Sequence, residues 1–179
     1  AVLRSTSLLK SIRRKYPRCQ ITWVTQSPAQ ALLDNIADLD RVLTIEPTDL
    51  LKLSALEFDV ALVIDKSLAA FGVLKHTQVR EIFGFKVNSM GGIVPANPEA
   101  RELWEIGLND SQKFFVNQKS EQRLVHEALA LGEYHRDEYQ VVFSQAEILE
   151  VNRRKKEWSP RSQKIIGINT GRSSNLPAK

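Results

Sequence analysis

The chain has 179 residues, of which 42% are hydrophobic and 26% charged, a balance typical of a globular domain and unlike that of a disordered chain. Its single cysteine, Cys19, excludes an internal disulfide framework and a zinc site built on paired thiols. The longest apolar stretch, Leu68 to Leu74, is far shorter than the roughly 20 residues that span a bilayer, and the first ten residues lack the apolar core of a signal peptide. We therefore expect a soluble cytoplasmic domain.

Helix and strand signals alternate along most of the chain. Helices are expected over residues 3–16, from Ser27 and Pro28 onward, from Asn97 and Pro98 to Gly107, and over Glu121–Leu131. Strands are expected over the β-branched runs Ile21–Thr25, Val42–Ile45, Val60–Ile64, Val141–Phe143 and Ile165–Ile168. Val60–Ile64 is apolar at every position, as in a parallel strand covered on both faces. The alternation predicts an α/β fold with a doubly wound, mostly parallel sheet of the Rossmann-like kind.

Both ends of the chain are expected to be truncated. The first helix has no strand before it, although the first strand of a doubly wound sheet is usually central. The charged stretch Arg153–Lys164 fits a linker between domains. We therefore predict a first domain over residues 1–158 that lacks its first strand, and over 159–179 a linker and the start of a second domain. The alternative is a compact single domain with true termini.

Net charge is +4, from 25 Lys and Arg against 21 Asp and Glu, and two basic runs concentrate it. These runs are Arg13–Lys15 and Arg153–Lys156. Each is interpreted either as a solvated helix face or as a site of attraction for anionic lipids or phosphorylated sugars. Nucleic acid ranks last as a partner, because the chain lacks the zinc-finger, recognition-helix and aromatic-plus-basic patterns of nucleic-acid binding.

Candidate site residues lie where strands end, because ligands of open α/β sheets collect at that edge. Asp65 follows an apolar strand, and a carboxylate there has two interpretations. In the functional one it binds a sugar hydroxyl or holds a catalytic group. In the structural one it caps the next helix or pairs with Lys66. The small, polar stretch Thr170–Ser174 could offer backbone N–H groups to a phosphate.

Other chemistry has little support in the sequence. The three histidines, His76, His126 and His135, have no partners at metal-ligand spacing, so surface or capping positions are expected for them. The motifs of P-loop, dinucleotide-binding and serine-hydrolase sites are missing, which removes the support for kinase, dehydrogenase and serine-hydrolase functions.

A series of segments, in this order, resembles the family 9 glycosyltransferases, the ADP-heptose:lipopolysaccharide heptosyltransferase family. The segments are Val2–Leu9, Tyr16-Pro17, Ile21–Thr25, Asp40–Leu43, Ile64–Ser67, Gly84-Phe85, Ile93–Pro95, Gly167–Gly171 and Pro177. The resemblance implies the two-domain GT-B fold, with this chain as the acceptor-binding N-terminal half. It also implies metal-independent, inverting transfer of heptose from ADP-heptose to an anionic lipopolysaccharide core acceptor, in the cytoplasm with peripheral contact to the inner membrane.

The resemblance assigns site residues by position. Arg4, Ser5, Thr6, Asp65 and Lys66 are expected to bind the acceptor, and Thr170 and Gly171 to begin the donor phosphate loop. The position of the family's catalytic Asp is occupied by Ala1, so no catalytic base is assigned. The full-length protein is therefore expected to be an enzyme, and this chain alone to be inactive and to need its C-terminal domain. A non-catalytic Rossmann-like binding or scaffold domain, which has lost the catalytic Asp, is the alternative.

Overall fold

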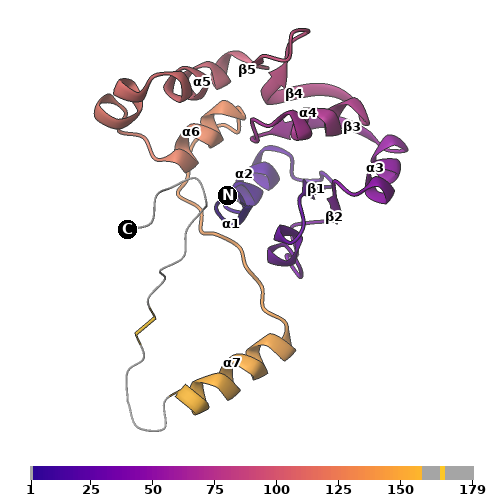
Figure 1. Ribbon diagram of the computed structural model, residues 1–179, viewed down its shortest axis with the longest axis vertical. Helices are drawn as coiled ribbons and strands as arrows, with labels where there is room; N and C mark the ends of the chain where they lie inside the picture. The colour runs from indigo at the N-terminus through magenta and orange to yellow at the C-terminus, as the bar shows by residue number, and fades with distance from the viewer. Residues whose placement is uncertain (1, 159–165, 168–179) are drawn as a thin grey trace. The chain divides into compact units, whose positions relative to one another are not determined.

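The computed structural model describes residues 2–158 and 166–167, and it divides the chain between Val142 and Phe143 into two units (Figure 1). The division falls before the predicted boundary at 158/159, which lies at the edge of the described residues and stays a prediction. The two units are described separately below.

The first unit contains alternating helices and strands. In chain order these are α1 (Val2–Ser5), α2 (Leu8–Lys15), β1 (Thr22–Thr25), η1 (Ala29–Leu32), β2 (Arg41–Thr44), α3 (Pro47–Ser54), β3 (Glu57–Val63), α4 (Leu68–Lys75), β4 (Gln78–Val87), β5 (Ile93–Pro95), η2 (Pro98–Ala100), α5 (Arg101–Leu108), η3 (Gln112–Val116) and α6 (Glu121–Ala128). The order confirms a mixed α/β chain.

The strands form two open sheets. In the first, β1 and β2 run parallel, with Thr22 opposite Arg41. In the second, β3 and β4 run parallel, and β5 adds to β4 in the antiparallel direction. Among the described residues, β1 and β3 therefore each have a strand partner on one side only. Parallel pairs connected through helices are compatible with a Rossmann-like α/β fold.

Helix α2 packs against both sheets (Figure 1). Leu9 belongs to a buried cluster on the β1–β2 side, together with Ile21. Leu8 belongs to a second cluster, with Leu129 after α6, against which residues of β3 and β4 pack. Ile12 packs against both clusters, so the apolar face of one helix covers the two sheets together.

Several expected elements differ in detail from those observed, among them the helix expected over Glu121–Leu131, which ends at Ala128. The helix expected over 3–16 is interrupted at Thr6 and Ser7, whose hydroxyls donate to the carbonyls of Leu3 and Arg4 and so compete with regular helix bonding. The helix expected from Ser27 is only the short 3₁₀ turn η1, and no side chain caps it. The expected strand Val141–Phe143 is wrong: this stretch is extended chain without a strand partner in the described part of the molecule.

Gly84, in β4, lies against the backbone of β3. Its φ is +95°, and a Cβ built there would lie 2.1 Å from the carbonyl oxygen of Val63. The backbone amide of Gly84 donates to Oδ1 of Asn97. The side-chain Nδ2 of Asn97 donates to the carbonyl of Ala128 at the end of α6. Asn97 therefore ties β4 to α6 and does not cap the helix that follows it.

The described part of the second unit consists mainly of α7 (Gln145–Trp158). Glu150 pairs with Arg153 at 2.8 Å and with Arg154 at 2.6 Å along the helix, and these bonds lower the pKa of Glu150 to about 2. The basic run at 153–156 is thus partly neutralised, which favours its interpretation as a solvated helix face. The start of the expected linker, up to Trp158, is helical, and the remainder lies outside the described residues.

The expected strand Ile165–Ile168 and the donor-loop residues Thr170 and Gly171 lie largely or wholly outside the described residues. Within the described ranges, every helix is too short or too polar to cross a lipid bilayer.

Candidate functional site

The turn after β3 carries two of the expected site residues. Asp65 is exposed, and its Oδ1 accepts a hydrogen bond of 2.8 Å from the backbone amide of Ser67. Ser67 in turn caps α4, because its Oγ accepts from the amide of Ala70. Ser67 is therefore the cap of α4, and Asp65 supports the turn before it by accepting from the Ser67 amide; it forms no ion pair with Lys66.

Lys66 extends from the same turn toward α5. Its ammonium lies 4.5 Å from the centre of the Phe85 ring and 3.5 Å from the carbonyl oxygen of Leu103. A Cβ on Gly107 would lie 3.4 Å from the ammonium nitrogen. Helix α5 continues through Gly107 to Leu108, so this glycine does not end the helix as expected; its missing side chain leaves room for Lys66.

Lys66 also lies close enough to Glu121 and Lys113 to interact with their charges. Burial lowers the pKa of Lys66, repulsion by Lys113 lowers it further, and attraction by Glu121 opposes both. Glu121, the first residue of α6, is the ion-pair partner of Arg4. Arg4, an expected acceptor residue, thus pairs with the carboxylate whose charge also acts on Lys66, although Lys66 forms no ion pair with it.

We call Arg4, Lys66, Lys113 and Glu121 the cationic cluster. Three of its members are cationic and one is anionic, and of the three cations Arg4 forms the ion pair with Glu121. No carboxylate in the described part of the chain lies within ion-pair distance of Lys66 or Lys113. The cluster lies at the carboxyl end of β3, the edge where open α/β sheets bind ligands. An arrangement of this kind can hold an anionic group such as a carboxylate or a phosphate.

The other two expected acceptor residues face different surroundings. Ser5, at the end of α1, is half-buried. Thr6 is fully buried, its Oγ1 donates to the carbonyl of Leu3, and it accepts from the amide of Gln140 at 2.8 Å. Thr6 therefore supports the turn between α1 and α2 and presents no accessible hydroxyl.

Sequence reasoning missed Glu121 and Lys113. Glu121 was expected only as the start of a helix, and it meets Arg4 across 117 positions of sequence. The capping position of Ser120 was the available local signal, because it fixes where α6 begins and hence where Glu121 points.

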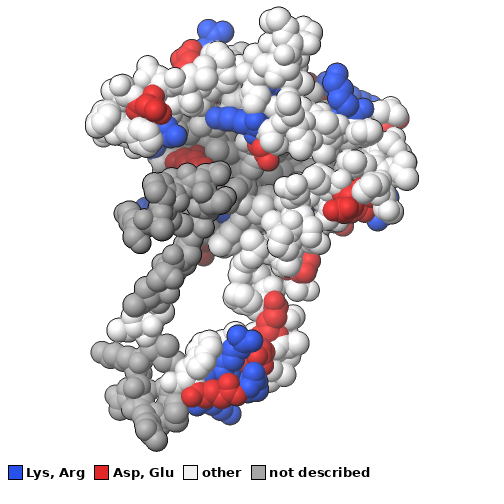
Figure 2. Space-filling view, in the orientation of Figure 1, with Lys and Arg blue, Asp and Glu red and all other residues white. Residues whose placement is uncertain are grey.

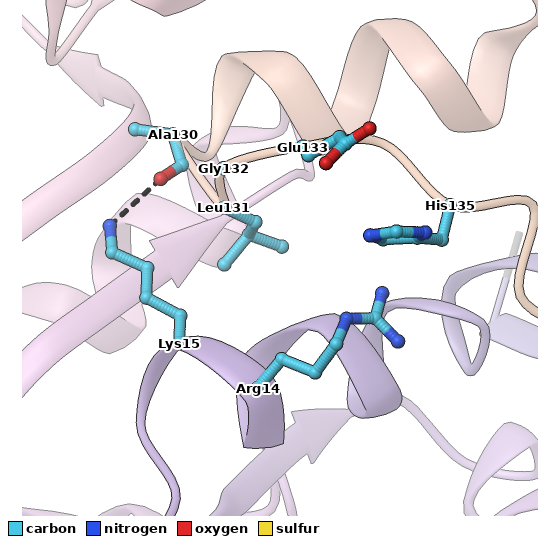
Figure 3. Close-up of a pocket in the computed structure, with 7 residues that line it drawn as sticks. All are labelled: Arg14, Lys15, Ala130, Leu131, Gly132, Glu133 and His135. Carbon is cyan, nitrogen blue, oxygen red and sulfur yellow. Dashed lines mark hydrogen bonds between the residues drawn. The ribbon is translucent and has the colours of Figure 1, made fainter.

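A hollow of about 320 Å³ lies at the other end of α2, lined by Arg14, Lys15, Ala130, Leu131, Gly132, Glu133 and His135 (Figure 3). The Lys15 ammonium donates to the carbonyl of Ala130 at 2.8 Å and lies 4.9 Å from the Phe83 ring. Arg14 is held by Asp137 at 3.0 Å. Both cations already have protein partners that tie α2 to the segment after α6, so we assign the hollow a structural role.

Beside this hollow, a serine, a histidine and an aspartate meet without forming a catalytic triad. Ser11 Oγ lies 3.1 Å from His126 Nε2 and 3.1 Å from Asp137 Oδ2, so the acid and the imidazole both contact the hydroxyl and not each other. Ser11 is 1% exposed, which leaves a substrate no approach. His126 is also 1% exposed, so the expectation of a surface or capping position for it is wrong.

The described residues contain no group of three or more His, Cys, Asp or Glu side chains placed to hold a metal ion. Comparisons with protein-family profiles, with curated protein sequences and with solved structures find nothing that matches this chain.

Proposed function

We propose that this chain is the acceptor-binding, Rossmann-like half of a GT-B glycosyltransferase similar to family 9, and that the cationic cluster binds the anionic part of the acceptor. The observation that carries the proposal is the half-desolvated Lys66 ammonium in the turn after β3, held over the Phe85 ring and near the carboxylate that pairs with Arg4. The family resemblance assigns both Arg4 and Lys66 to the acceptor site.

The chemistry of the cluster supports an acceptor with carboxylate or phosphate groups. Lys66 is partly desolvated against Phe85, which strengthens its interaction with an anion relative to a fully hydrated ammonium. An incoming anion would also relieve the repulsion between Lys66 and Lys113. Glu121 keeps Arg4 oriented until the anion binds.

In the proposed reaction the acceptor hydroxyl attacks the anomeric carbon of the nucleotide sugar, and the nucleoside diphosphate leaves with the electrons of the broken bond. A base must take the hydroxyl proton, and no described residue is assigned to that step. The donor, with ADP-heptose as the first candidate, would be held by the C-terminal domain.

The test measures how tightly the chain binds a deacylated, heptose-free lipopolysaccharide core saccharide. Binding is measured by isothermal titration calorimetry at low and at moderate salt. The variants Arg4→Gln and Lys66→Gln should each weaken binding about tenfold, as expected when one charge-assisted contact is lost. Lys86→Gln, which removes an exposed cation from β4, should leave the affinity unchanged.

Absence of binding by the unaltered chain, or equal losses in all three variants, would contradict the proposal. Binding that depends on Arg4 and Lys66 but yields no heptose transfer by the full-length protein would instead support the non-catalytic binding domain. Replacing the saccharide by a neutral one of similar size distinguishes recognition of charge from recognition of sugar.

A further inference from the structure

Four large apolar side chains are exposed together on and after the end of α5. Leu108 is 70% exposed, Phe114 66%, Phe115 85% and Val116 67%. We call residues Leu108–Val116 the aromatic segment. Exposed apolar residues that occur singly are normal, but four within nine positions of sequence, three of them consecutive, are typical of an interaction surface.

The aromatic segment is held in place at both ends. At its start, the Asn109 carbonyl accepts from the amide of Lys113 at 2.9 Å, and Asn109 Oδ1 accepts from the amide of Gln112 at 3.1 Å. At its end, the Asn117 amide donates to the carbonyl of Gln112 at 2.8 Å, which closes the π-helical turn η3. The backbone is thus satisfied locally while both phenylalanine rings face outward. Single π-helical turns are rare and often lie at functional sites.

The aromatic segment is continuous with the cationic cluster. It begins directly after Gly107, the residue that faces the Lys66 ammonium. Lys113, within the segment, carries its charge 5.0 Å from the centre of the Phe114 ring and repels Lys66. An apolar surface beside unpaired cations is complementary to an anionic lipid surface, where phosphates lie next to hydrocarbon.

On the face shown in Figure 2, basic and acidic side chains are interspersed. A net charge of +4 over the whole chain would therefore give only weak, diffuse attraction to a membrane. A bound state of fixed orientation needs a local apolar anchor in addition.

We propose that the aromatic segment docks this chain on an anionic lipid bilayer, with Phe114 and Phe115 inserted at the boundary of the hydrocarbon and Lys113 facing lipid phosphates. This inference rests on the proposed function and deepens it, because a glycolipid acceptor is held in an anionic lipid surface. Docking here would present the cationic cluster to a head group without extracting the lipid.

The test is flotation of the 179-residue chain with vesicles of equal parts phosphatidylglycerol and phosphatidylcholine, which contain no sugar acceptor. The double variant Phe114→Ser/Phe115→Ser should lose about tenfold or more of vesicle affinity, because two rings lose their contact with hydrocarbon. The matched control, Leu51→Ser/Met90→Ser, removes two apolar side chains that are 72% and 89% exposed elsewhere, and should bind as the unaltered chain does. Lys113→Gln should weaken binding to these vesicles and leave the weaker binding to pure phosphatidylcholine unchanged.

Failure of the unaltered chain to float at low salt would overturn the inference, as would equal binding by the Phe114→Ser/Phe115→Ser variant. Loss of a dimer in that variant, without vesicle binding by the unaltered chain, would identify the surface as an interface between copies and likewise overturn it. Circular dichroism should show the same fold in all variants, since every substituted side chain is exposed. Saccharide binding is measured separately, so failure of the proposed function and failure of this docking give different results.

Discussion

Nε2 of His126 lies 3.1 Å from Oγ of Ser11. Both side chains are buried, and Nδ1 of the same imidazole has no hydrogen-bond partner among the described residues. The contact joins α6 to α2, and through Asp137 it also holds the segment that follows α6.

The pH dependence of stability should report on His126. Burial lowers the pKa of His126 below its ordinary 6.5, and the charge of Arg14 lowers it further. The charges of Asp137 and Glu127 oppose this shift, and His135 adds to it to a smaller extent. Between the lowered pKa and 6.5 the unfolded chain binds more protons, so the free energy of unfolding should fall as the pH falls through this window.

Urea unfolding at about pH 7.5 and about pH 5.5 measures this loss. His126→Gln should lose less stability between the two values than the unaltered chain. His76→Gln, at an exposed position after α4 that has no part in the His126 shift, should lose the same amount as the unaltered chain. An unchanged pH dependence in His126→Gln would contradict the assignment.

Ser11→Ala should destabilise the first unit by about 1–3 kcal/mol, because Nε2 of the buried His126 loses its partner. Asp137 also loses a hydrogen bond, although Arg14 still holds it. Thermal and urea unfolding provide the measurement. Ser54→Ala removes an exposed hydroxyl that bonds only within α3, and should change stability by less than about 0.5 kcal/mol.

Gly84→Ala should destabilise the chain by about 3 kcal/mol or more, since the added Cβ would meet the Val63 carbonyl at 2.1 Å and φ is +95°. Gly72→Ala offers the opposite case: in α4, with nothing within 4 Å of the added carbon, it should stabilise by about 0.5–1 kcal/mol. Equal effects of the two substitutions on the midpoint of urea unfolding would show that β3 and β4 are not this close.

The unpaired edges of β1 and β3 should make the chain self-associate. Each edge presents backbone N–H and C=O groups that lack a strand partner in the described part of the molecule, and such edges pair with other chains. Sedimentation velocity at increasing concentration should show association that the Phe114→Ser/Phe115→Ser variant does not abolish. A monomer with a sharp, concentration-independent thermal transition would be the contrary result.

The β-branched runs Ile21–Thr25 and Val42–Ile45 predict β1 and β2 to within one residue at each end. Val60–Ile64 is apolar at every position and lies within or just after β3, whereas β4 was missed because Arg80, Glu81 and Lys86 interrupt its apolar pattern. Val141–Phe143 has the right composition but finds no partner strand, and pairing is not encoded locally.

The site was predictable to the level of the sheet edge. Asp65 and Lys66 were expected there because polar residues after an apolar strand mark that edge. Their neighbours Glu121 and Lys113 come from elements whose packing against β3 depends on contacts distant in sequence. The buried position of His126 was missed for a similar reason, since its partner Ser11 lies on another helix.

The position of Ile12 against both hydrophobic clusters has a consequence for local opening of the chain. The apolar face of α2 covers both sheets, so α2 cannot separate from one sheet without exposing the other to solvent. Amide protons of β1 and β3 should therefore exchange with deuterium in a single cooperative event, although no hydrogen bond of the described chain joins the two strands.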